Sequence, residues 1–276
     1  MIRYCNIGYI LIVLLVLTNI AHAQQPIALD STDRYLTTIR FEVPGLSRHR
    51  VVRIFLPSSY YSSSRKYPVI YMQDGQNLFY WPKHNSDSWY VDSLVNSFSP
   101  GKQVIIVGID NGGNQHRMTE YNPYDGYYGK EEGILYTKFI VNVIKPYIDQ
   151  HYKTKTSFKN TAIVGSSMGG IIAMYAAVKF DKVFGYAGIL SPVFWVAPQM
   201  YQDVADSPIN HKSKFFLSCG SEEGNESNQI TKMDSILRNK HLSSKNVPAP
   251  LILKGAKHNE QQWRVTFDSF YKWFIQ

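Results

Sequence analysis

A run of five residues, Gly165-Ser166-Ser167-Met168-Gly169, limits the fold more than any other part of the chain. Residues 161–165, which lead into it, are small or β-branched and predict a buried strand, whereas residues 168–180 have the pattern of a helix. A strand that passes directly into a helix must turn very tightly. Glycines two positions before and after Ser167 allow this turn without a Cβ clash, so the Ser167 hydroxyl is expected above the sheet at the helix N-terminus.

Strand-like and helical segments alternate along the whole chain. This alternation predicts an α/β fold with a mostly parallel central sheet, helices on both faces and an antiparallel N-terminal edge. Strands are expected at residues 38–43, 50–56, 68–73, 103–109, 161–165, 186–190, 214–219 and 250–253. Helices are expected at 87–98, at 133–150 with a kink at Pro146, at 168–180, and in the last segment, where Trp263, Phe267, Phe270 and Phe274 share one face as in core packing.

The first residues are typical of an export signal. Arg3 precedes the apolar run 7–20, and Ala21-His22-Ala23 has the small-x-small pattern of a signal peptidase site. We expect residues 1–23 to be a cleaved signal peptide, residues 24–276 to form a single domain, and the protein to be periplasmic or secreted. An uncleaved anchor is the alternative, although the run is short for a spanning helix. Cleavage would remove the apolar run, so no stable membrane insertion is expected. It would also leave Cys219, expected in the core, as the one cysteine, so no intramolecular disulfide could form.

The chain is basic, with a formal net charge of +8 at pH 7, but its basic residues are scattered. A nucleic-acid-binding protein normally has a clustered basic stripe and a known motif, so the charge indicates a solvated surface and no nucleic-acid partner is expected. The sequence has no metal-ligand cluster and no phosphate-binding loop, so no metal and no cofactor are expected. The oligomeric state is left open.

A serine on such a turn is the nucleophile position of α/β-hydrolase sites, in which an acid and then a histidine follow it along the chain. The histidines after Ser167 are His211, His241 and His258. Only His258 lies in a short loop between a predicted strand, 250–253, and the last helix. We therefore expect His258 to be the general base that accepts the serine proton.

The orienting acid is expected after the strand 214–219. Glu222, Glu223 and Glu226 all meet this condition, and position alone does not choose among them. Its role would be to hold His258 in the correct tautomer and to stabilise the imidazolium.

Two backbone N–H groups are expected to bind the oxyanion of the reaction. One belongs to Met168, which directly follows the predicted nucleophile. The other is expected in the turn after the strand 68–73, where Gly75 permits close approach, and the N–H of Gln76 is the first choice.

Six segments together resemble a known family: YPVIYMQDGQNLF (67–79), GIDNGGNQHRMTEYNP (108–123), IKPYIDQHYKTK (144–155), AIVGSSMGG (162–170), LSCGSEEGNE (217–226) and HNEQQW (258–263). They resemble the esterase D or "putative esterase" family of α/β-hydrolases. That family includes feruloyl and acetyl-xylan esterases of carbohydrate esterase family 1 and siderophore esterases. The resemblance implies Ser167 as nucleophile, His258 as base and Glu223, at the fourth position of G-x-x-[DE], as acid. It also places Arg117 and Glu120 in an R-x-x-E-Y segment near the mouth of the site, where we expect an ion pair that shapes the pocket.

These features predict an exported serine carboxylic-ester hydrolase that forms an acyl-enzyme on Ser167. The expected substrate is a carbohydrate-linked or other small acyl ester; the alternatives are a siderophore (catecholate trilactone) esterase, an acyltransferase and a non-catalytic binding protein on the same fold. Aromatic-rich loops are expected either to line a cleft for feruloyl groups or sugars or to be structural. They contain Tyr80-Trp81, Trp89-Tyr90, Tyr121, Tyr124, Tyr127-Tyr128 and Phe194-Trp195.

Overall fold

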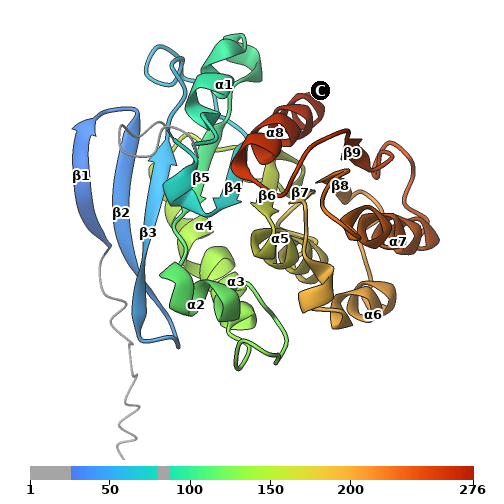
Figure 1. The fold of residues 1–276 in the computed structure, drawn as a ribbon. Coiled ribbons are helices and arrows are strands. Elements are labelled where there is room, and N and C mark those ends of the chain that lie inside the picture. Colours follow the sequence, from blue (N-terminus) through green and yellow to red (C-terminus); the bar gives the residue numbers. More distant parts are fainter. Residues whose placement is uncertain (1–25, 80–87) are drawn as a thin grey trace, which may run out of the picture.

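The computed structural model describes residues 26–79 and 88–276, and its strands form one nine-stranded sheet (Figure 1). The order is β1-β2-β3-β5-β4-β6-β7-β8-β9. Pairing is antiparallel from β1 to β5 and parallel from β5 to β9, so the predicted sheet is confirmed. The strands are β1 (Ile27–Asp33), β2 (Leu36–Val43), β3 (Arg48–Phe55), β4 (Val69–Gln73), β5 (Ile105–Ile109), β6 (Thr161–Ser166), β7 (Tyr186–Leu190), β8 (Lys214–Gly220) and β9 (Leu251–Leu253).

Helices cover both faces of this sheet, as predicted (Figure 1). Helices α1 and α8 pack on one face and α3 to α7 on the other. The bounds are α1 (Val91–Ser97), α2 (Gly113–Glu120), α3 (Gly133–Phe139), α4 (Lys145–His151), α5 (Met168–Lys179), α6 (Gln199–Asp206), α7 (Glu226–Asn239) and α8 (Glu260–Phe274). The described residues contain no helix that is both long enough and apolar enough to span a membrane.

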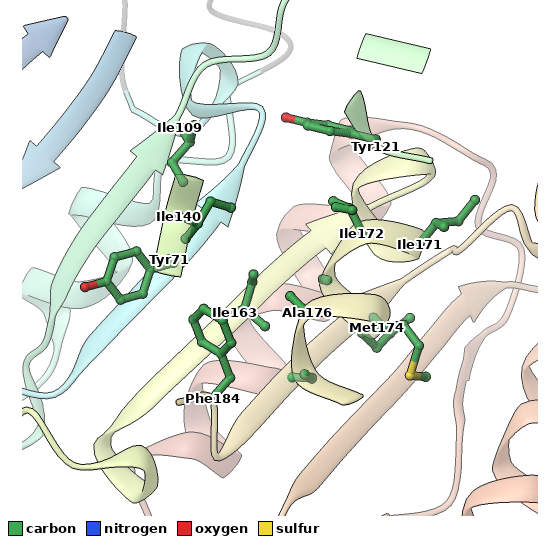
Figure 2. Close-up of a cluster of buried hydrophobic side chains, with 14 of the residues drawn as sticks. Tyr71, Ile109, Tyr121, Ile140, Ile163, Ile171, Ile172, Met174, Ala176 and Phe184 are labelled. Atoms are coloured by element: carbon green, nitrogen blue, oxygen red, sulfur yellow. The ribbon is translucent and has the colours of Figure 1, made fainter. Parts of the chain in front are cut away.

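The central strands are buried on both faces, which explains their nearly continuous apolar sequences. Side chains alternate between the two cores: Tyr71 and Ile163 belong to the core under α5, and Ile70 and Val164 to the core under α8. Figure 2 shows the first core, in which α5 lies over Ile163 and its neighbours. This packing fixes the end of β6 and the start of α5 relative to each other.

The aromatic stripe of α8 packs in the core, as predicted. Trp263, Phe267, Phe270 and Phe274 are all at least nine-tenths buried. Cys219, on β8, is also buried and unpaired, and burial raises the pKa of its thiol to about 12.

Three local predictions differ from the structure. Strand β1 was not expected from its sequence; Ile27 and Leu29 are nearly half exposed, so this edge strand lacks a clear buried face. The helix predicted at 133–150 contains a π-helical segment at Ile140–Ile144, which ends beside Pro146, a residue that cannot donate a backbone hydrogen bond. The helix predicted at 87–98 begins only at Val91, and Asp87 itself lies outside the described residues, as do residues 1–23 and Tyr80-Trp81.

Candidate active site

Ser167 occupies the strained turn that its flanking glycines predict. It is the residue between β6 and α5, and its backbone has φ 56° and ψ −125°. Positive φ is costly for a residue with a side chain, so the packing around the turn must hold it. At Gly165 a Cβ atom would clash with the backbone carbonyl group of Gly169, which explains why this position needs glycine.

Three side chains from distant parts of the chain meet at the carboxyl ends of the parallel strands. The Nε2 atom of His258 lies 2.9 Å from Ser167 Oγ, and its Nδ1 atom lies 2.8 Å from Glu223 Oε2. The His258 side chain is 35% exposed, whereas that of Glu223 is 1% exposed. A buried carboxylate thus orients an accessible imidazole, which can exchange a proton with the serine hydroxyl.

The structure places Glu223, rather than its two neighbours, beside His258. Glu222 is half exposed, with its carboxylate 3.9 Å from Lys257 Nζ. Glu226 is buried, but within the described residues its carboxylate accepts from Gln229 and makes no hydrogen bond to His258. Glu223 reaches the histidine because its other oxygen, Oε1, accepts from the Gly220 N–H at 2.5 Å and from Ser191 Oγ at 2.8 Å. The supporting residue Ser191 was not predicted, since nothing in the sequence shows that the β7 and β8 loops meet.

The two expected oxyanion donors lie at this same edge of the sheet. Met168 begins α5 and lines a cavity that also contains Ser167 and His258. Gln76 lies in a short 3₁₀ turn, Gly75–Asn77, directly after β4, and its side-chain Oε1 accepts from the Asn111 N–H. Their oxyanion roles remain predictions.

Arg117 and Glu120 do not form the expected ion pair. Arg117 binds the carboxylate of Asp74 through two hydrogen bonds of 2.8 and 2.9 Å, and Asn111 donates to the same carboxylate. Asp74 follows β4 with a positive φ of 55°, so it is another strained residue at the site. Asp74 raises the pKa of Arg117 against the opposing effect of burial, so the guanidinium is charged where it borders the cavities.

Glu120 lies away from the cavities that contain Ser167. It is fully buried and binds Arg50 and Arg48 of β3, with Nη1 of Arg48 2.9 Å from Oε1. The pocket prediction for Glu120 is therefore wrong. Glu120 pairs with the two arginines of β3, whereas Arg117 is already bound by Asp74.

Two cavities flank Ser167 and His258. The larger, about 440 Å³, has a mainly apolar wall that includes Met118, Tyr128, Met168, Val193, Trp195 and Val196 together with Arg117, Glu223 and Glu226. The smaller, about 240 Å³, is more polar and includes Asp74, Asn77, Trp89, Asn111, Ser166, Arg117, Glu260 and Trp263. An ester bound with its carbonyl at Ser167 would thus have the apolar cavity on one side and the more polar cavity on the other.

Within the described residues, which leave out Tyr80 and Trp81, part of the expected aromatic cleft is present. Trp195 is 63% exposed and Tyr128 is 41% exposed, and both line the larger cavity. Trp89 is buried at the smaller cavity, whereas Tyr121 and Phe194 belong to the core. Among the described residues, no three His, Cys, Asp or Glu side chains are grouped as metal ligands.

A mostly parallel sheet with this strand–serine–helix turn at its carboxyl edge defines the α/β-hydrolase class. The family described as "Putative esterase" matches residues 44–274, and the chain therefore belongs to that family of ester hydrolases. Among curated proteins, the uncharacterized YbbA of Bacillus subtilis is 27% identical over 207 residues, 68% of this chain and 76% of YbbA. An endo-1,4-beta-xylanase/feruloyl esterase of Xylanibacter ruminicola is 24% identical over 82% of this chain, but over only 29% of its own length. The enterobactin esterase of Shigella flexneri has the same fold, with a TM-score of 0.67 and 16% identity over 87% of this chain and 57% of that one.

Proposed function

We propose that the protein is a serine carboxylic-ester hydrolase that forms an acyl-enzyme on Ser167. The observation that carries this proposal is the continuous hydrogen-bonded series Ser167–His258–Glu223, with distances of 2.9 and 2.8 Å. The hydroxyl, the imidazole and the carboxylate have the geometry required of a nucleophile, a general base and an orienting acid.

The proposed reaction has two halves. Ser167 Oγ attacks the ester carbonyl carbon as His258 Nε2 takes its proton, and the N–H groups of Met168 and Gln76 stabilise the oxyanion. The bond to the alcohol oxygen breaks, and His258 returns the proton to the departing alcohol. Water then attacks the acyl carbon as His258 Nε2 takes one of its protons. The bond from the acyl carbon to Ser167 Oγ breaks, His258 returns the proton to Oγ, and the free acid leaves.

The proposed substrate is a carbohydrate-linked or other small acyl ester. Trp195 and Tyr128 support this choice because they present aromatic surface beside Ser167 in the larger cavity. The feruloyl esterase relative is consistent with it. A catecholate trilactone is the alternative substrate, favoured by the shared fold with the enterobactin esterase and by the charged Arg117 at the cavity wall.

We further propose that the protein acts outside the cytoplasm after removal of residues 1–23, on the basis of the leader-like N-terminal sequence. Mass determination of the mature protein recovered from the native host would test this. A mature N-terminus at Gln24 is expected, and an intact Met1–Ala23 segment would contradict it.

The central test compares the wild type with Ser167→Ala. Hydrolysis of p-nitrophenyl acetate and labelling by a fluorophosphonate probe should both be lost, with a fall in kcat on the order of 10⁶-fold. Ser218→Ala is the matched control, because this buried serine on β8 lines neither cavity and its Oγ has no hydrogen-bond partner among the described residues. Retained activity in Ser167→Ala would refute the proposal. Acetylated xylan, methyl ferulate and a catecholate trilactone, each assayed with and without an added sugar acceptor, would then identify the ester and separate hydrolysis from acyl transfer.

A further inference from the structure

Glu223 needs more support than a shorter acid in the same position. Glutamate has one more rotatable bond than aspartate, so its carboxylate loses more conformational freedom when it is held against a histidine. Oε2 is used by His258, and Oε1 is held by the Gly220 N–H and by Ser191 Oγ. Of these two donors, only the Ser191 hydroxyl belongs to a side chain.

Ser191 is held in an unusual conformation. It directly follows β7, is fully buried and has a φ of 43°, and its N–H donates to the Ser218 carbonyl at 2.7 Å. A serine with positive φ is strained, and strain persists where the surroundings determine the conformation. The hydroxyl is thereby aimed at Glu223 from the neighbouring strand-end loop.

Gln262, on α8, completes the surroundings of this hydroxyl. It is 3% exposed, and its Oε1 atom lies 3.1 Å from Ser191 Oγ, while its Nε2 atom has no partner within the described part of the chain. A serine hydroxyl has one proton and cannot donate to both Glu223 and Gln262. Turning the Gln262 amide by 180° resolves this conflict, because Nε2 then donates to Ser191 Oγ and the serine proton goes to Glu223.

We infer that Ser191 and Gln262 are positioning residues, which hold the Glu223 carboxylate against His258 through the relay Gln262 → Ser191 → Glu223. The inference rests on the proposed function. Gln262 lies four residues after His258, and its N–H donates to the Asn259 side chain at 3.1 Å. The hydrogen bonds of the relay therefore connect the loops after β7 and β8 to the loop after β9, which carries His258, and to the start of α8.

The test measures kcat, KM and the NMR signal of the His258 Nδ1 proton in Ser191→Ala and Ser191→Gly. Both variants should lower kcat for p-nitrophenyl acetate about 10-fold, the loss expected for one hydrogen bond to a charged group, with KM unchanged because Ser191 does not line either cavity. The downfield Nδ1 proton signal should broaden or shift. Ser191→Gly removes the strain as well as the hydroxyl, so a folding defect in the alanine variant alone would not obscure the result.

Ser218→Ala is the matched control. Ser218 is also a fully buried serine, one strand away, but its Oγ has no hydrogen-bond partner among the described residues. Its replacement should leave kcat and the Nδ1 signal unchanged. Gln262→Met should resemble Ser191→Ala, and the double variant should be no worse than either alone, because both act through one hydroxyl.

Two results would separate the possible failures. If Ser191→Ala and Ser191→Gly keep kcat within twofold of the wild type and an unchanged Nδ1 signal, the relay is refuted while the proposed function stands. If Ser167→Ala is also fully active, the proposed function itself fails.

Discussion

Replacing Glu226 by glutamine should stabilise the protein at alkaline pH and have little effect at acidic pH. Glu226 begins α7 and is 4% exposed. Its Oε1 accepts one long hydrogen bond of 3.3 Å from Gln229, and its Oε2 has no partner in the described ranges. Burial, reinforced by the charge of Glu223, raises the pKa of Glu226 to about 7.

The sign and size follow from proton linkage. A carboxyl whose pKa is higher in the folded protein stabilises it fully below the pKa of the unfolded chain, and this contribution is lost as pH rises through about 7. A rise from the ordinary value of 4.5 corresponds to about 3 kcal/mol at most. For a domain of this size that is a difference in Tm of about 6–12 °C. Glutamine resembles the protonated acid and so avoids the cost of ionisation.

The assay is thermal unfolding of Glu226→Gln and the wild type at pH 4.5 and pH 8.5. The variant should have nearly the wild-type Tm at the lower pH and a clearly higher Tm at the upper one. Glu222→Gln serves as the control, because its half-exposed side chain lies 3.9 Å from Lys257 and should contribute little at either pH. An equal difference in Tm at both pH values, or a lower Tm for Glu226→Gln at pH 8.5, would refute the reasoning.

The other predictions concern the turn, the acid and the cavity. Gly165→Ala should destabilise the fold by more than about 3 kcal/mol, because its Cβ meets the backbone of Gly169; a wild-type urea midpoint would contradict this. Glu223→Gln should lower kcat about 10⁴-fold with KM unchanged, since an amide cannot stabilise the His258 imidazolium. Steady-state kinetics of ester hydrolysis measure both constants, and a kcat near wild type would exclude Glu223 as the acid. Trp195→Ala should raise KM for aryl esters several-fold with Tm unchanged, because the ring is 63% exposed at the cavity; an unchanged KM would remove Trp195 from the substrate site.

The sequence was sufficient for the features that depend on local pattern. The glycines around Ser167 predicted the strained turn, and apolar runs predicted the parallel strands, because both effects act between residues close in the chain. The partners of Arg117 and Glu120 were not predictable in the same way. They lie on β3 and at the end of β4, and spacing along one helix does not reveal which strand end faces it.

The choice of Glu223 among three glutamates also depends on contacts between segments that are distant in the sequence. The three residues lie within five positions of one another, so sequence distance does not separate them. What separates them is the position of the Gly220 N–H and the Ser191 hydroxyl, and the latter comes from a different strand-end loop. The family pattern pointed to Glu223 without giving this physical reason.

Strand β9 has a consequence for how the protein responds to heat. It is three residues long, forms the edge of the sheet opposite β1, and is only partly buried, yet the loop after it carries His258. Regions with little burial open locally at lower free energy than the core. Departure of β9 from the edge would separate His258 from Ser167 while α5 and the central strands stay folded. Catalytic activity should therefore disappear reversibly several degrees below the temperature at which circular dichroism detects melting.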